Sequence, residues 1–98
     1  MIKHMVFFKF LEQADGRSKA ENLARAKEML DNLVGRVPTL RAMTCGPVAV
    51  PGGWDFALIA EFDDVAGLET YIDHPEHRKV SAFMGQVRSD RASADLSC

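Results

Sequence analysis

Four side chains of this chain have the chemistry for proton transfer near neutral pH. Tyr71, His74 and His77 lie within one short stretch, and His4 lies among apolar residues near the start of the sequence. A histidine ring titrates close to neutral pH, so it is able to accept a proton as a general base. A tyrosine hydroxyl is able to donate a hydrogen bond to an oxygen that gains negative charge.

His77 is the candidate base. Pro75 suits the first position of a helix, so His77 follows at about the third position. The positive end of the helix dipole disfavours a charged ring there and keeps the imidazole neutral. A neutral ring is then able to take a proton from a carbon between two carbonyls, while Tyr71 donates to the enolate oxygen. The structural alternative is that His77 only braces the helix start and packs on the sheet.

The other two histidines also have two interpretations each. His74 precedes a proline and is therefore extended; it either makes local hydrogen bonds near the helix start or lines a ligand pocket. His4 either bonds a neighbour inside the core or faces His77 across the gap between sheet and helices. The three rings together offer three metal ligands, but no obvious carboxylate or thiol completes the shell, and we expect no metal.

Composition restricts the class of protein. The 98 residues are 47% apolar and 27% charged, which is typical of one globular domain spanning residues 1–98. A net charge of −2 with interleaved signs argues against nucleic-acid or membrane partners. Cys45 and Cys98 fit no disulfide pattern, and the short apolar start lacks a cleavage site. We therefore expect free thiols, no signal peptide and a cytoplasmic location.

The periodicity of apolar residues predicts the elements that position these side chains. Ser18 and Glu21 have the spacing of a capping box at a helix start. The predicted elements are strand 2–10, helix 18–34, a weaker strand 40–50, strand 54–62, a helix from 65 to 87 that is broken before Pro75, and a faint strand 92–98. This order predicts an α+β, ferredoxin-like fold, with helices on one face of a four-stranded antiparallel sheet.

The second face of the predicted sheet is also partly apolar. Met5 and Phe7 on the first strand, and Ala57 and Ile59 on the third, point away from the side that the helices cover. A face open to water does not usually carry such residues. The same face of a second copy is the simplest cover, so we expect a homodimer joined through its sheets.

The sequence resembles the stress-responsive dimeric α+β barrel (Dabb) family over nearly its whole length. The residues that carry the resemblance are 2–6 with its Lys-His pair, 54–58, and 71–77 with its His-Pro-x-His motif. The resemblance implies a dimeric α/β barrel. A more distant resemblance is to the olivetolic acid cyclase-like polyketide cyclases, which close a ring by aldol condensation without a metal. It implies His77 as base, Tyr71 as its partner, and His4 as a pocket residue.

The chain departs from the cyclase branch at Phe56, where that branch carries another pocket histidine; a phenylalanine makes the expected pocket more apolar. We therefore expect a homodimer of undetermined activity that binds a small apolar or carbonyl ligand between sheet and helices, through His4, His74 and Phe56. One alternative is a cyclase-like lyase. The second is a monooxygenase of related barrels, although no haem-binding pattern is present and we expect no cofactor. A pocket that exposes both His4 and His77 would favour the lyase.

Overall fold

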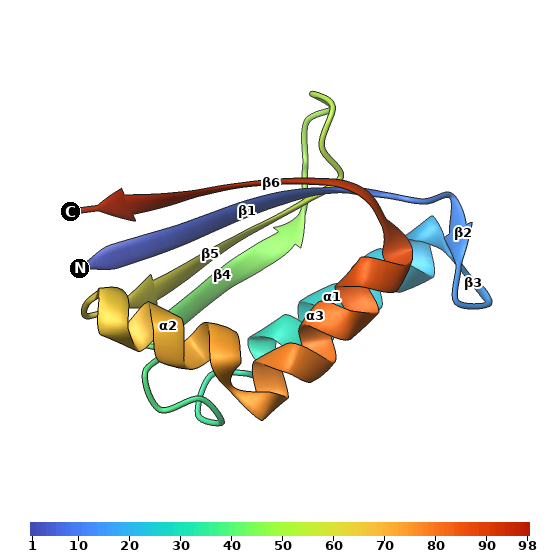
Figure 1. The fold of residues 1–98 in the computed structure, drawn as a ribbon. Helices are drawn as coiled ribbons and strands as arrows, with labels where there is room; N and C mark the ends of the chain where they lie inside the picture. Colours follow the sequence, from blue (N-terminus) through green and yellow to red (C-terminus); the bar gives the residue numbers. More distant parts are fainter.

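The computed structural model describes residues 1–98. Three helices cover one face of a four-stranded sheet, and a small hairpin lies at one end (Figure 1). The elements in chain order are β1 (Ile2–Phe10), β2 (Gln13–Ala14), β3 (Arg17–Ser18), α1 (Lys19–Asp31), β4 (Ala42–Pro47), β5 (Phe56–Phe62), α2 (Val65–Asp73), α3 (Pro75–Val87) and β6 (Arg88–Ser97). No helix has the length and apolar character needed to cross a bilayer.

The main sheet has the strand order β4-β5-β1-β6, and every neighbouring pair is antiparallel. This confirms the predicted ferredoxin-like sheet with helices on one face. The first and last strands pair along their full lengths, so the two chain termini lie side by side (Figure 1). In this register His4 is opposite Ala60 of β5 and Asp95 of β6.

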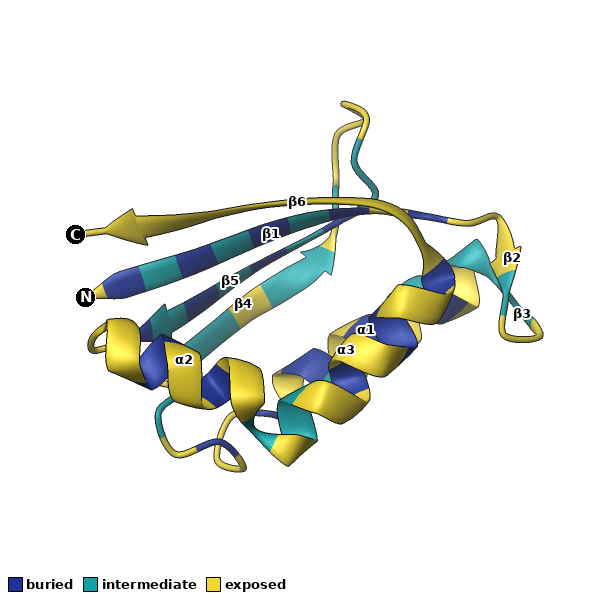
Figure 2. Ribbon diagram, in the orientation of Figure 1, coloured by how far each residue is buried: buried dark blue, intermediate teal, exposed yellow.

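The core lies between the sheet and the helices. Along β1 and β5 the buried and half-buried residues alternate, as side chains of period two require (Figure 2). The even-numbered side chains of both strands are buried and face α1, α2 and α3. The core cluster comprises Ile2, Val6, Phe8, Phe10, Ala26, Leu30, Leu33, Val37, Leu40, Phe56, Leu58, Ala60, Phe62, Leu68, Tyr71, Val80, Phe83, Met84 and Val87.

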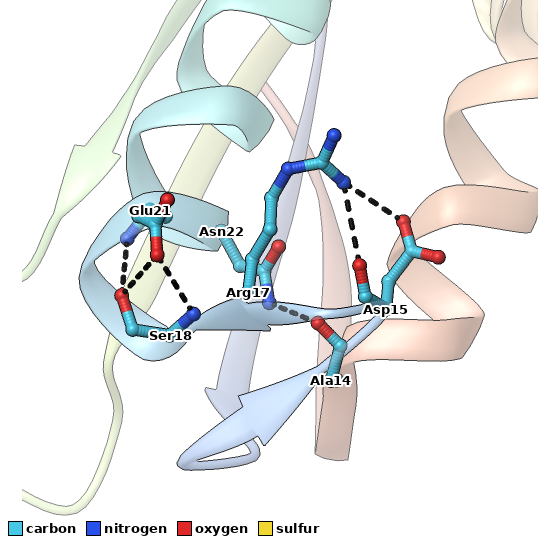
Figure 3. Close-up of polar contacts among 6 residues, drawn as sticks. All are labelled: Ala14, Asp15, Arg17, Ser18, Glu21 and Asn22. Atoms are coloured by element: carbon cyan, nitrogen blue, oxygen red, sulfur yellow. Dashed lines mark hydrogen bonds and ion pairs between the residues drawn. The ribbon is translucent and has the colours of Figure 1, made fainter.

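The capping box predicted for the first helix is confirmed (Figure 3). The Ser18 hydroxyl accepts the Glu21 N–H at 3.2 Å, and the Glu21 carboxylate accepts the Ser18 N–H at 3.1 Å. The buried Asn22 amide donates to the Ala14 carbonyl at 3.0 Å and so ties α1 to the β2–β3 hairpin. The two short strands β2 and β3 were not predicted from the sequence.

Several predicted boundaries differ from the structure, including the start of β5, which is Phe56 and not residue 54. Helix α1 ends at Asp31, because Asn32 caps it and the chain then turns so that Leu33 is buried outside the helix. Strand β4 is shorter than the predicted 40–50. Strand β6 begins at Arg88, well before the predicted residue 92, and its residues are exposed along its whole length (Figure 2). An exposed edge strand carries no apolar alternation, which is why its sequence gave a faint signal.

We predict that Ser18→Ala lowers the free energy of unfolding by about 1 kcal/mol, because it removes the side-chain oxygen that accepts the Glu21 N–H. Urea denaturation followed by circular dichroism measures this change. Ser89→Ala, at an exposed position of β6, is the control and should leave the midpoint unchanged. Equal midpoints for Ser18→Ala and the unsubstituted chain would contradict the prediction.

Candidate active site

A cavity of about 330 Å³ lies between the sheet and the helices. Strands β1, β5 and β6 and all three helices contribute to its wall. The lining residues are His4, Val6, Phe8, Leu30, Leu58, Tyr71, Ile72, His77, Val80, Ser81, Met84, Arg88 and Arg91. Three of the predicted site residues, His4, Tyr71 and His77, therefore line one cavity.

His77 lies in the first turn of α3 and is half-buried. Its Nδ1 is 3.1 Å from the carbonyl oxygen of Ile72. A carbonyl only accepts, so Nδ1 carries the proton and Nε2 is left as the unprotonated acceptor. Burial lowers the pKa of His77 below its ordinary value, and the nearby His4 and Arg91 lower it further. The ring is therefore neutral at neutral pH, in the form that a base requires.

Tyr71 lies in α2 and is almost completely buried. Its ring packs against the His77 ring, with 4.3 Å between the centroids. Its hydroxyl has no hydrogen-bond partner within the protein, and burial raises the pKa of Tyr71. The hydroxyl therefore stays protonated and is free to donate to a ligand oxygen in the cavity.

His4 projects from the centre of the sheet and bonds the neighbouring strand β6. Its Nδ1 is 2.5 Å from Oδ1 of Asp95, the residue directly opposite in the register. The carboxylate fixes the ring orientation and favours the tautomer with the proton on Nδ1. The His4 ring also meets Tyr71 edge-on, with centroids 6.4 Å apart. His4 thus has a partner in the core and a cavity-facing position at once.

His74 and Phe56 lie outside the cavity. His74 is the N-cap of α3, where its Nδ1 accepts the Glu76 N–H at 3.1 Å; this is the local role that the sequence offered as an alternative. Phe56 is fully buried, and its ring packs against Phe8 and Phe10. The three histidines do not form a group with the geometry of a metal site.

Cys45 also lies outside the cavity, half-buried on β4 under α1. Its thiol lies 3.4 Å from a carboxylate oxygen of Asp31. Burial, followed by this bond, raises the pKa of Cys45 to about 12. The thiol is therefore protonated at neutral pH and is not an activated nucleophile.

Sequence reasoning missed four polar residues of the site: Ser81, Arg88, Arg91 and Asp95. Ser81 follows His77 by four residues, so helical spacing was enough to place it on the same face. The other three belong to β6. Their roles depend on which residues they face across the sheet, and the register of an exposed strand cannot be deduced from its composition.

Comparison with known proteins agrees with this fold. A model of the stress responsive A/B barrel domain, Dabb, matches residues 2–98. The chain belongs to the Dabb family. No curated protein matches this Dabb domain.

Solved structures similar to this Dabb domain share the ferredoxin-like fold. A dimeric protein of unknown function from Bacteroides fragilis is 28% identical, with a TM-score of 0.82 over 99% of this chain and 95% of that one. A dimeric ferredoxin-like protein of unknown function from Thermobifida fusca is 25% identical, with a TM-score of 0.83 over 99% and 90%. A hydroxynitrile lyase from Passiflora edulis is 16% identical, with a TM-score of 0.82 over 97% and 90%, and shows the fold alone.

We predict that His77 titrates below the ordinary pKa of 6.5 in the folded protein, because the cavity wall withdraws it from water. Since the folded state binds this proton more weakly than the unfolded chain, the stability that His77 contributes is present above about pH 6.5 and is lost as the pH falls. Histidine ring shifts followed by NMR against pH measure the value. His77→Gln assigns the resonance, and a midpoint above 6.5 would contradict the prediction.

Proposed function

We propose that this Dabb domain binds a small carbonyl compound in the cavity and removes a proton from the carbon next to the carbonyl. One observation carries the proposal. His77 has an unprotonated Nε2, Tyr71 has a hydroxyl without a protein partner, and both residues line the same cavity. An acceptor for the proton and a donor for the resulting oxygen anion are the two groups that this reaction needs.

The step balances within these two residues and the ligand. The C–H proton moves to Nε2 of His77, and the C–H electron pair forms the enolate, whose oxygen accepts a hydrogen bond from Tyr71. The cavity disfavours the charged ring, so the imidazolium readily returns its proton. When the enolate carbon attacks a second carbonyl of the same ligand, a carbon–carbon bond forms and the π electron pair of that carbonyl moves to its oxygen. This oxygen then takes the proton from the His77 imidazolium, which completes the aldol-type ring closure of a cyclase-like lyase.

The rest of the wall suits this ligand. Val6, Phe8 and Leu58 supply apolar surface for a carbon skeleton, and His4, held by Asp95, adds a second polar group beside Tyr71. Because the polar groups around Tyr71 are acid–base residues, lyase chemistry is favoured over the monooxygenase alternative. His74 and Phe56 act from outside the cavity: His74 fixes the start of α3, and Phe56 supports the Phe8 wall.

We also propose that the open sheet face joins two copies into a barrel. The helices cover only one face of the sheet (Figure 1). The opposite face carries Met5, Phe7, Ala57 and Ile59, as predicted, and the register adds Leu96 of β6, which is 52% exposed. A self-complementary apolar face of this kind fits a two-fold interface. Two relatives that are at least 25% identical are described as dimeric, which supports it.

The remaining expectations stay predictions. A cytoplasmic location is consistent with the two unpaired cysteines, Cys45 and Cys98. The absence of nucleic-acid and membrane partners rests, as before, on the net charge of −2 and its mixed distribution.

Acetophenone tests the proton transfer, because its methyl hydrogens exchange slowly with D₂O unless a base acts on them. We predict that the protein accelerates this exchange, and that His77→Gln loses at least about a hundredfold of the acceleration. Tyr71→Phe should lose less, since only the hydrogen bond to the enolate oxygen is removed. Proton NMR of the methyl signal measures the rate.

His74→Gln is the matched control for the exchange assay, because His74 caps α3 and does not line the cavity. It should retain the acceleration of the unsubstituted protein. The observed rate should also fall on acidification, as His77 becomes protonated. Acceleration that survives His77→Gln unchanged would exclude His77 as the base.

The interface has its own prediction. Ile59→Lys places a charge in the middle of the open face and should convert the dimer to a monomer in light scattering. Val65→Lys is the control, because Val65 lies on α2, away from this face, and is already 55% exposed. A monomeric unsubstituted protein would refute the proposed interface.

A further inference from the structure

Both arginines that line the cavity are cationic, and the acid of the site, Asp95, does not line the cavity and bonds His4. Arg88 and Arg91 line the cavity, whereas none of the lining residues is an aspartate or a glutamate. His77 is neutral at neutral pH because its pKa is lowered. A concave, partly apolar site with guanidinium groups and no acid on its wall attracts anions.

The backbone positions of the two arginines are displaced along the cavity wall from that of His4. On α3, His77, Ser81 and Met84 follow one another at spacings of four and three and share one face of the helix, and Arg88 follows α3 as its C-cap and the first residue of β6. At 1.5 Å per residue, the backbone of His77 is separated by about 15 Å along the helix axis from the end of α3, which precedes Arg88.

The strands of the sheet also separate the arginine positions from the position of His4. On β6, Asp95 is opposite His4, whereas Arg91 is opposite Phe8, four residues further along β1. Four residues of strand correspond to about 13 Å. His4, Tyr71 and His77 are therefore attached to the backbone towards one end of the cavity wall, and Arg88 and Arg91 are attached towards the other end.

The guanidinium groups of Arg88 and Arg91 have no carboxylate partner within the protein. Neither Arg88 nor Arg91 forms an ion pair, and the Arg91 side chain makes only a long hydrogen bond of 3.4 Å to the Ser93 hydroxyl. By contrast, Arg36, Arg41 and Arg78 each have a carboxylate partner within 4.0 Å. The nearest acid in the sequence, Asp90, is opposite Lys9 and so belongs to the other face of β6.

We infer that the ligand of this cavity carries a carboxylate, which Arg88 and Arg91 bind while the carbonyl end lies at His77 and Tyr71. The carbonyl end rests on the proposed function; the carboxylate end rests on the arginines alone. A guanidinium matches a carboxylate in geometry and donates two parallel hydrogen bonds to it. The skeleton between the two ends lies on Val6, Leu58 and Val80.

Two probes of one shape test the inference: para-acetylbenzoate, with a ketone and a carboxylate, and para-acetylbenzamide, with the same ketone and no charge. Isothermal titration calorimetry should give about tenfold tighter binding of the acid than of the amide, as expected for charge-assisted hydrogen bonds. Added salt should weaken only the acid. The double variant Arg88→Gln/Arg91→Gln should bind both probes equally.

Arg36→Gln removes one positive charge outside the cavity and should keep the preference for the acid; Arg91→Lys keeps the charge and should retain part of it. Equal binding of acid and amide by the unsubstituted protein, no binding of the acid, or a double variant that still prefers the acid would overturn the inference.

The outcome is independent of proton transfer. His77→Gln should keep the preference for the acid while losing methyl exchange. If the unsubstituted protein prefers the acid but exchanges no methyl hydrogens of either probe, the carboxylate site stands and the proposed function fails. If it exchanges both probes but binds them equally, the proposed function stands and the carboxylate site fails.

Discussion

Side chains along β1 alternate between two apolar surroundings, and the rest of the molecule depends on that alternation. The even-numbered residues face the helices, where they form the core and, at His4, reach the cavity. The odd-numbered Met5 and Phe7 face the uncovered side of the sheet. A shift of β1 by one residue would exchange these two sets, so core, cavity and open face are all fixed by one register.

The break between α2 and α3 then brings the acid–base groups together. Pro75 has no N–H to donate, and His74 before it is extended and caps the new helix. A continuous helix would place Tyr71 and His77 six residues apart, on different sides of its axis. The change in direction instead packs one ring on the other, and the Ile72 carbonyl left over at the end of α2 fixes the His77 tautomer.

The two histidines that line the cavity, His77 and His4, have different bonding partners. Burial lowers the pKa of His77 most, and the nearby His4 and Arg91 lower it further. The hydrogen bond to the Ile72 carbonyl acts in the opposite direction. His4 has a carboxylate on Nδ1. Titratable groups held in contrasting environments are typical of sites that transfer protons.

Signals from residues close together in the sequence were sufficient to predict helix starts and strand β1. The capping box at Ser18 and the proline at residue 75 each mark a helix start through local effects, and both helix starts are present in the structure. Period-two alternation likewise located β1 and the apolar second face of the sheet. Tyr71 and His77 could be paired from the sequence because they are close to each other both in the sequence and in space.

Only the tertiary structure decided what pairs across the sheet and what lies in the cavity. The partner of His4, the position of the arginines and the full extent of β6 depend on a register between the two ends of the chain, and an exposed edge strand leaves no pattern that encodes it. Phe56 was expected at the ligand because of the resemblance to the cyclases, and His74 because of its position before Pro75. In the structure Phe56 packs in the core and His74 caps α3. Sequence fixes local conformation through nearby atoms, whereas a binding site is assembled from residues whose proximity exists only after folding.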